Sequence, residues 1–235
     1  MTRNILKLTE KIRAFEGICV AEFRHDFIRF CIECGVLRFG SFVTKSGRTT
    51  PYFFNPGLFN TGARLDRLAE FYAKAILSSG VEFDMLFGPA YKGIALAAAT
   101  SMALARMGHD VPFAFNRKEV KDHGEGGNII GASPEGRVLV VDDVMTAGTA
   151  VREAVAILEA YEAQMAGVAI SLDRMERGAG EQSAVQEVEE RYGVPVIAIA
   201  TADDLLMYLE NEPDLAQYLQ AISEYRQHYG AIGYA

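Results

Sequence analysis

The sequence predicts an α/β protein in which helices cover both faces of a mainly parallel sheet. Helical and extended segments alternate from Gly62 to the end of the chain. The segment Val138–Val141 is apolar at every position, which is typical of a strand buried on both faces of a parallel sheet. Together, the alternation and the apolar strands indicate a doubly wound arrangement.

The N-terminal region is expected to form a small hood of helix and β structure outside the main sheet. Residues from Ile5 to about Gly35 carry apolar side chains at three- and four-residue steps, which indicates an amphipathic helix. Short extended pieces follow at 37–39 and 42–44, and the aromatic strand Tyr52–Phe54 lies between two prolines.

The remaining elements are expected to alternate along a core. They are helices at 65–76, 94–107, 151–161 and 184–192, strands at 84–87, 111–115, 138–141, 166–172 and 194–200, and two short terminal helices. We expect two parts in the chain, an N-terminal helical extension and hood at 1–62 and a core with C-terminal helices at 63–235. Ligands of parallel α/β sheets bind at the carboxyl ends of the strands, so a site is expected there.

The composition argues against nucleic acid and membranes as partners. Acidic residues outnumber basic ones by 31 to 23, and a net charge of −8 repels polyphosphate backbones. No apolar run is long enough for a signal peptide or a membrane-spanning helix. We therefore expect a soluble cytoplasmic protein, in which the basic contacts to any small anionic ligand are concentrated locally.

Three cysteines, Cys19, Cys31 and Cys34, cannot all pair with one another, which favours a reducing compartment. Cys31 and Cys34 form a C-x-x-C pair, for which redox and zinc roles are alternatives. No second Cys or His pair stands at metal-binding spacing, and the surrounding segment has the pattern of a buried helix face. We therefore favour a place in the core for this pair.

The strongest functional signal directly follows the apolar strand 138–141. Two acids, Asp142 and Asp143, precede a turn of small residues from Thr146 to Ala150 that opens a helix. Backbone N–H groups and hydroxyls in such a turn can hold a phosphate with help from the helix dipole. Carboxylates beside a phosphate repel it unless they bind sugar hydroxyls or a metal ion, so the pattern describes a ribose 5-phosphate site. The alternative is a helix N-cap with a solvated neighbour, and neither the P-loop nor the dinucleotide-binding pattern is present.

This stretch resembles the phosphoribosyl pyrophosphate (PRPP) binding motif of the type I phosphoribosyltransferases, and the resemblance implies their fold. Other segments resemble the orotate-specific enzymes of that family in order and spacing: Phe39–Gly40, Lys45–Arg48, Pro51–Asn55, Phe87–Gly93, Phe115–Glu119, Lys121–Gly127 and Ser171–Arg174. The similarity extends from about Phe23 to about Tyr229. Roughly the first 20 residues look like an extension, and Met145 stands where a branched apolar residue is expected.

The resemblance implies a PRPP site that spans several strand ends. Its residues are Lys45, Tyr91, Lys92, Arg117, Lys118, Lys121, His123, Asp142, Asp143, Val144, Met145, Thr146, Ala147, Gly148, Thr149 and Ala150. In the turn Gly88–Gly93, glycines allow the backbone to approach pyrophosphate closely and Lys92 adds a point charge. An ordinary solvated lysine is the alternative.

Between Arg117 and His123 lies the local cluster of basic residues that the acidic composition requires, and three glycines follow within four residues. This combination indicates a mobile lid that closes over a polyanion and excludes water. A solvated loop is the alternative, since Glu119, Asp122 and Glu125 interrupt the cluster. The resemblance implies that the lid reaches into the active site of the other subunit of a homodimer.

The resemblance also assigns an orotate site to Lys45, Phe53, Phe54, Thr146 and Arg174. A planar anion needs an aromatic face and a cation, and the fork of Arg174 suits bidentate pairing with a carboxylate. Without the resemblance, Phe53 and Phe54 could equally belong to a buried strand, and Arg174 could be a helix-capping surface residue.

The expected activity is transfer of the 5-phosphoribosyl group from PRPP to N1 of orotate, which gives orotidine 5′-monophosphate and pyrophosphate in de novo pyrimidine synthesis. Lys121, Asp142 and Asp143 are the expected catalytic residues, with Mg²⁺ bound through PRPP and water near the two aspartates. The alternatives are a type I enzyme for another nucleobase and a noncatalytic regulator that senses PRPP. An assay across bases distinguishes the first, and a complete lid without a DNA-binding module argues against the second.

Overall fold

The computed structural model describes residues 20–44, 47–121, 127–145 and 148–233. Its centre is a six-stranded sheet in the order β5-β4-β3-β6-β7-β8. The strands are β3 (Met85–Gly88), β4 (Phe113–Lys121), β5 (Gly127–Gly131), β6 (Arg137–Val141), β7 (Gln164–Asp173) and β8 (Val196–Thr201). All neighbouring strands are parallel except β4 and β5, which are antiparallel. The prediction of a mainly parallel sheet is confirmed.

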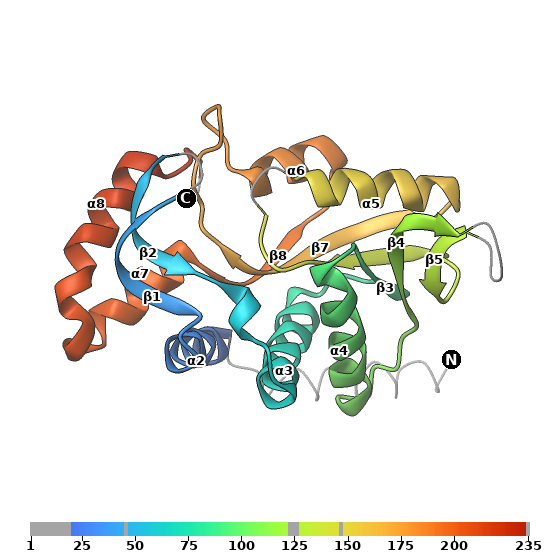
Figure 1. Cartoon of the computed structure of the whole chain (residues 1–235), viewed down its shortest axis with the longest axis horizontal. Coiled ribbons are helices and arrows are strands. Elements are labelled where there is room, and N and C mark those ends of the chain that lie inside the picture. Colours follow the sequence, from blue (N-terminus) through green and yellow to red (C-terminus); the bar gives the residue numbers. More distant parts are fainter. Residues whose placement is uncertain (1–19, 45–46, 122–126, 146–147, 234–235) are drawn as a thin grey trace, which may run out of the picture.

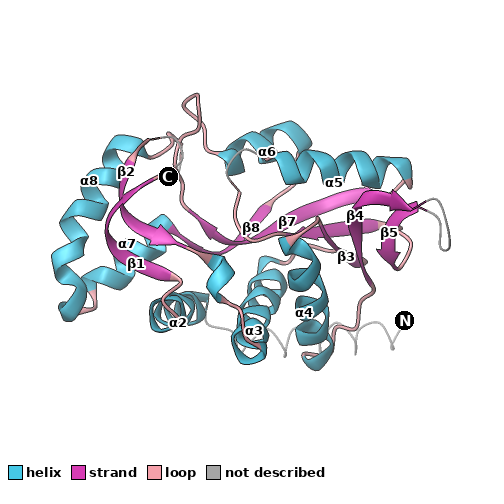
Figure 2. Ribbon diagram, in the orientation of Figure 1, coloured by secondary structure: helices cyan, strands magenta, loops and turns pink. Residues whose placement is uncertain are grey.

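Helices cover both faces of this sheet (Figures 1 and 2). On one face lie α3 (Gly62–Ser79) and α4 (Lys92–Arg106), and on the other α5 (Thr149–Ala160) and α6 (Ala184–Tyr192). In β6, Leu139 and Val141 belong to the core cluster under α3 and α4, whereas Val138 and Val140 belong to the cluster under α5 and α6. Successive side chains of a strand point to opposite faces, which explains why this strand is apolar at every position.

The hood consists of α2 (Val20–Glu33), the antiparallel hairpin of β1 (Leu37–Val43) and β2 (Thr49–Phe54), and the short helix η1 (Pro56–Leu58). The expected pieces at 37–39 and 42–44 are one strand, interrupted by a register shift between Phe39 and Phe42. The part of the expected N-terminal helix before Val20 lies outside the described residues.

The C-terminal elements pack onto this hood (Figure 1). They are α7 (Ala202–Glu210), η2 (Pro213–Tyr218) and α8 (Leu219–Tyr229). The ring of Phe39 stacks on that of Tyr218 with centroids 4.9 Å apart, and Arg24 forms an ion pair of 3.0 Å with Asp204. The hood and the C-terminal elements therefore build one layer, while a domain boundary at residue 62 stays a prediction.

Strand β5 was not expected, and β4 extends further than the predicted strand 111–115. Gly127–Gly131 begins and ends with glycine and lacks a strand-like pattern, so its extended conformation depends on pairing with β4. Consequently, the segment from Arg117 to Lys121, expected to start a loop, belongs to β4.

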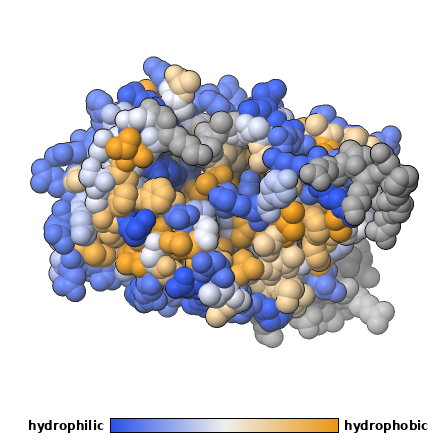
Figure 3. Space-filling model, in the orientation of Figure 1, coloured by the Kyte–Doolittle hydropathy of each residue, from blue (hydrophilic) through white to orange (hydrophobic). Residues whose placement is uncertain are grey.

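Cys31 is buried in the hood core, and the half-buried Cys34 packs against the same cluster, as predicted. Both cysteines are free. None of the helices in the described part of the chain has the length and apolar character needed to cross a bilayer. On the face seen in Figure 3, apolar residues gather over the hood and hydrophilic residues surround them.

Candidate functional site

The carboxyl ends of β3, β4, β6 and β7 carry the polar residues of the candidate site. Asp142 and Asp143 follow β6, and the turn that contains Lys92 follows β3. Because β3 and β6 are parallel neighbours, the two segments leave the same edge of the sheet. The ammonium group of Lys92 is paired with the carboxylate of Asp143.

The surrounding structure holds Asp143 in place from three sides. Its carboxylate accepts a hydrogen bond of 2.8 Å from the backbone N–H of Val144 and pairs with Lys92. Its carbonyl oxygen accepts bonds from the hydroxyl and the backbone N–H of Ser171 in β7, at 2.5 and 2.8 Å. Asp143 is only 7% exposed, so its orientation is determined by its contacts rather than by water.

Asp142 lies in a different electrostatic environment. Its side chain accepts a hydrogen bond of 2.9 Å from the N–H of Asp143, and its carbonyl accepts one of 2.7 Å from the hydroxyl of Tyr72. Burial raises the pKa of Asp142 from 3.8 to about 6, and the negative charge of Asp143 adds to this rise, while the Asp143 N–H and Lys92 oppose it. The site therefore contains a carboxylate that can change its charge near neutral pH.

The turn after β3 depends on two glycines. A Cβ on Gly88 would lie 2.1 Å from the carbonyl oxygen of Gly93, and a Cβ on Gly93 would lie 2.8 Å from the carbonyl oxygen of Val141. A residue with a Cβ therefore fits at neither position unless the turn opens or moves away from β6. The N–H of Ala90 donates a 2.8 Å hydrogen bond to the side chain of Asn116, so β4 helps to fix the turn.

The basic residues of β4 lie beside this turn. The Lys118 ammonium is 5.4 Å from the ring centroid of Tyr91, a distance at which a cation and an aromatic ring attract each other. Arg117 also belongs to β4, and Lys121 pairs with Gly127 of β5 at the end of the hairpin. The expected loop is therefore a β hairpin at its base, whereas His123 lies outside the described residues.

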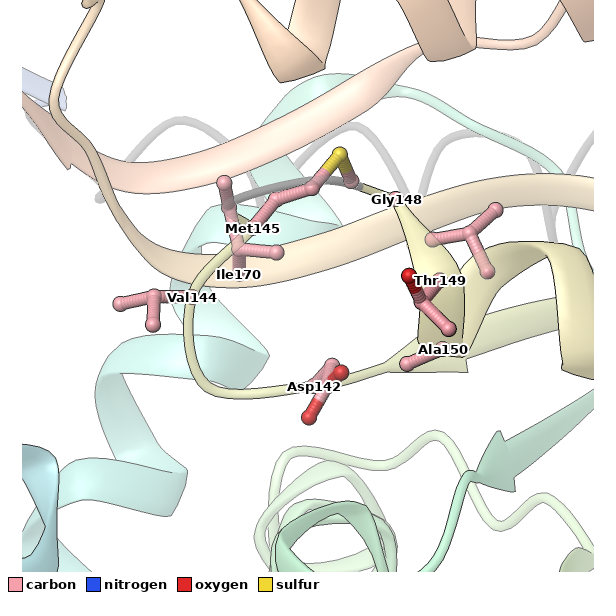
Figure 4. Close-up of a pocket in the computed structure, with 8 residues that line it drawn as sticks. Asp142, Val144, Met145, Gly148, Thr149, Ala150 and Ile170 are labelled. Carbon is pink, nitrogen blue, oxygen red and sulfur yellow. The ribbon is translucent and has the colours of Figure 1, made fainter. Parts of the chain in front are cut away.

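A small cavity separates Asp142 from the start of α5 (Figure 4). The cavity measures about 100 Å³ and is lined by Asp142, Val144, Met145, Gly148, Thr149, Ala150, Val151 and Ile170. In Figure 4 the loop after Asp142 bends around this space, and Thr149 lies across it from Val144. The volume corresponds to that of about three liquid waters, and α5 presents the positive end of its dipole there. Thr146 and Ala147 lie outside the described residues.

A larger cavity of about 620 Å³ lies between the hood and the loop after β7. Its lining includes Thr44, Arg48 and Arg174. Arg48 joins the two walls, because its guanidinium donates hydrogen bonds of 3.1 and 3.3 Å to the carbonyls of Arg177 and Gly178. Lys45, which follows Thr44 in the sequence, lies outside the described residues.

The orotate residues expected in the hood do not share one face of the hairpin. Phe53 is 37% exposed and stacks on Phe42, with ring centroids 5.5 Å apart, whereas Phe54 is buried in the hood core. Adjacent strand residues point to opposite faces, so their two rings cannot together form one aromatic wall. Arg174 lines the cavity, but its guanidinium is already bound by Glu176 and Thr50.

Several residues that shape the site were not among the predicted ones. They are Arg48, Tyr72, Asn116, Ser171 and Glu176. Asn116 and Ser171 carried a usable signal, because each is a polar residue near the carboxyl end of an otherwise apolar strand segment. Tyr72 and Glu176 carried none, because their roles depend on partners far away in the sequence or on the fold of a turn.

Comparisons with known proteins show the family and the fold of the chain. Residues 58–203 match the family described as phosphoribosyl transferase domain. Over 211 residues, 90% of this chain, orotate phosphoribosyltransferases of Laribacter hongkongensis and Chromobacterium violaceum are 64% and 61% identical, and 99% of each relative is covered. The crystal structure of orotate phosphoribosyltransferase from Francisella tularensis superimposes with a TM-score of 0.80 at 44% identity, covering 87% of this chain and 99% of that one. The chain therefore belongs to the orotate phosphoribosyltransferase family and has the type I phosphoribosyltransferase fold.

Proposed function

We propose that the site at the end of β6 joins orotate to the ribose of PRPP, forming orotidine 5′-monophosphate and pyrophosphate in pyrimidine biosynthesis. The observation that carries this assignment is the position of Asp142 and Asp143, between the phosphate-sized cavity at α5 and the turn that contains Lys92. This order matches the order of groups in PRPP: 5-phosphate, ribose and pyrophosphate.

For PRPP, we assign one part of the site to each part of the ligand. The backbone and hydroxyl groups at Val144–Ala150 hold the 5-phosphate at the positive end of α5. Asp142 and Asp143 accept hydrogen bonds from the ribose hydroxyls, for which acceptor-only carboxylates are suited. Pyrophosphate is bound by Tyr91 and by a set of basic side chains. These side chains belong to Lys45, Lys92, Arg117, Lys118, Lys121 and His123.

In the reaction, N1 of orotate gives up its proton to solvent and forms a bond to C1 of the ribose as the bond from C1 to the pyrophosphate oxygen breaks. Positive charge develops on the ribose, and the carboxylates of Asp142 and Asp143 stabilise it electrostatically. The electron pair of the broken bond leaves with pyrophosphate, whose added charge Lys121 and Lys92 stabilise. Lys92 contacts Asp143 already, so it can share its charge between that carboxylate and the leaving group.

The carboxylates also suit Mg²⁺. No cluster of three or more His, Cys, Asp or Glu side chains able to hold a metal exists among the described residues, so a cage made of protein alone is not the arrangement proposed. Mg²⁺ usually keeps several waters and binds through one or two carboxylates plus substrate phosphates, which fits Asp142 and Asp143. When bound, the ion neutralises charge on PRPP and its leaving group.

We place orotate in the 620 Å³ cavity beside the hood. Arg174 faces the carboxylate of the base, and Lys45 and Thr146 provide polar contacts. Because the rings of Phe53 and Phe54 lie on opposite faces of β2, we assign their contact with the base chiefly to main-chain groups. We further propose a cytoplasmic homodimer in which residues at the tip of the β4–β5 hairpin close over the site of the other subunit.

The direct test is consumption of orotate by the purified chain with PRPP and Mg²⁺, followed at the absorbance of orotate. Parallel reactions contain adenine, hypoxanthine or uracil in place of orotate. We expect turnover with orotate and little with the other bases. A folded protein that consumes another base but not orotate, or no base at all, contradicts the proposal.

A further inference from the structure

Arg174 is held in one orientation by its neighbours. Its Nε and Nη2 atoms lie 2.7 and 2.6 Å from the same carboxylate oxygen of Glu176, and Nη2 donates a 3.1 Å hydrogen bond to the hydroxyl of Thr50. The guanidinium carbon lies 4.6 Å from the ring centroid of Tyr52. The side chains of Arg174 and Glu176 are only 23% and 19% exposed, so this arrangement is a partly buried charge pair.

These contacts leave one part of the guanidinium available. A guanidinium has five N–H donors, and the contacts with Glu176 and Thr50 occupy the donor on Nε and both donors on Nη2. Among the described residues, Nη1 has no hydrogen-bond partner. The donors on Nη1 are therefore the ones left for a ligand carboxylate, and bidentate pairing at the Nη1 and Nη2 edge requires the bond to Thr50 to break.

The backbone brings Glu176 to Arg174. Met175, between them, has a φ of 54°, a left-handed conformation that is unfavourable for a residue with a side chain. Its N–H donates a 2.8 Å hydrogen bond to the side chain of Asp173, and its carbonyl accepts a 2.9 Å bond from Ala231. Glu176 itself forms a β-bridge with Gly230 after α8. Contacts on both sides therefore fix the turn, and the turn presents Glu176 to Arg174.

We infer that Glu176 is a positioning residue, which holds the guanidinium of Arg174 so that Nη1 receives an acidic group on the pyrimidine. The inference rests on the proposed role of Arg174 as the contact for the orotate carboxylate. Charge-assisted hydrogen bonds are stronger and more directional than neutral ones, so a carboxylate at position 176 limits the rotation of a long side chain. The entropy of ordering Arg174 is then lost during folding and not during binding.

A competing role for Glu176, in which the substrate displaces it from Arg174, predicts a different effect of the same variants on orotate binding. If Glu176 were a stand-in that the substrate carboxylate must displace, its negative charge would compete with orotate, and both Glu176→Gln and Glu176→Ala would strengthen orotate binding. If Glu176 positions Arg174, Glu176→Ala weakens binding. Glu176→Gln keeps an oxygen acceptor at the same place, so this variant should retain most of the affinity for orotate.

The test measures KM for orotate and for PRPP, kcat, and the dissociation constants of two product nucleotides. Orotidine 5′-monophosphate carries the carboxylate and uridine 5′-monophosphate lacks it, so the ratio of their affinities isolates recognition of the acidic group. In Glu176→Ala we expect a roughly tenfold higher KM for orotate, an unchanged KM for PRPP, and a roughly tenfold smaller preference for the acidic nucleotide. Glu181→Ala, which removes an exposed acid from the same loop, is the matched control and should change none of these values.

The Arg174→Ala variant distinguishes a wrong assignment of Arg174 to the orotate carboxylate from a wrong positioning role for Glu176. If the nucleotide preference survives Arg174→Ala, the proposed role of Arg174 is wrong. If Arg174→Ala abolishes the preference but Glu176→Ala leaves it intact, only the positioning role is refuted. Tighter orotate binding in both Glu176 variants also refutes it, in favour of displacement. Thermal unfolding of each variant establishes that the measured protein is folded.

Discussion

Replacing Asp142 with asparagine should stabilise the protein at neutral and alkaline pH while impairing its activity. Burial raises the pKa of Asp142 from 3.8 to about 6, so the folded state binds the proton more tightly than the unfolded state does. The stability that this group contributes is therefore present at low pH and is lost as the pH rises through about 6. A shift of about two units corresponds to about 3 kcal/mol, of which about 2 kcal/mol falls between pH 4 and pH 8.

Asparagine cannot ionise, and its oxygen can still accept the hydrogen bond from the Asp143 N–H. The free energy of unfolding of Asp142→Asn, relative to that of the unchanged chain, should therefore be about 2 kcal/mol larger at pH 8 than at pH 4, which means that the variant gains stability as the pH rises. Urea unfolding at both pH values measures this difference, at one fixed protein concentration because association shifts apparent stability. Asp110→Asn, which replaces an exposed carboxylate between α4 and β4, is the control and should show little pH-dependent difference.

An equal effect of Asp142→Asn at pH 4 and pH 8 would falsify the reasoning, because it would mean that burial does not disfavour the ionised form. The same variant should lose turnover with orotate and PRPP, since the residue is proposed to stabilise charge on the ribose. Higher stability with lower activity is the expected cost of holding a charged group in a partly buried site.

Three further changes test other parts of the site. Lys121→Ala should reduce turnover by about 10²-fold or more without changing thermal unfolding, and near-normal turnover would remove Lys121 from the catalytic residues. Tyr72→Phe removes the buried hydroxyl that donates to the Asp142 carbonyl and should lower the free energy of unfolding by about 1–2 kcal/mol in urea titrations; a change within error would show that the bond contributes nothing net. Gly88→Ala places a Cβ against a backbone oxygen of the same turn and should cost about 3 kcal/mol with loss of PRPP binding. Gly62→Ala, which adds a Cβ in open space at the start of α3, is its control, and equal effects of the two would contradict the packing argument.

Local sequence was sufficient to predict the sheet and the place of the site. Val138–Val141 is apolar at every position, and only a sheet covered on both faces accommodates such a strand. Asp142 and Asp143 stand at its carboxyl end, where ligands of parallel sheets bind. Helix α6 begins with a capping box at Ser183, a pattern that acts over four residues and needs no tertiary information.

Strand β5 and the orientation of two aromatic side chains were harder to predict than the parallel strands. β5 contains Gly127 and Gly131 at its ends, and glycine has a low preference for strands, so only the pairing with β4 makes this segment extended. For Phe53 and Phe54, adjacency in a strand already implies opposite faces. The packing of the hairpin on the rest of the hood decided that the ring of Phe54, and not that of Phe53, points into the core.

By itself, the sequence determined the order of the strands and helices along the chain apart from β5, the acidic pair after β6 and the glycine turn before α4, because each depends on preferences that act over a few residues. Only the tertiary structure decided which charges meet. Lys92 and Asp143 are 51 residues apart, and Arg174 and Thr50 are 124 apart. Burying a charged group such as Asp143 is favourable only when it finds a partner, and the partners come together only after the sheet, the helices and the hood have packed.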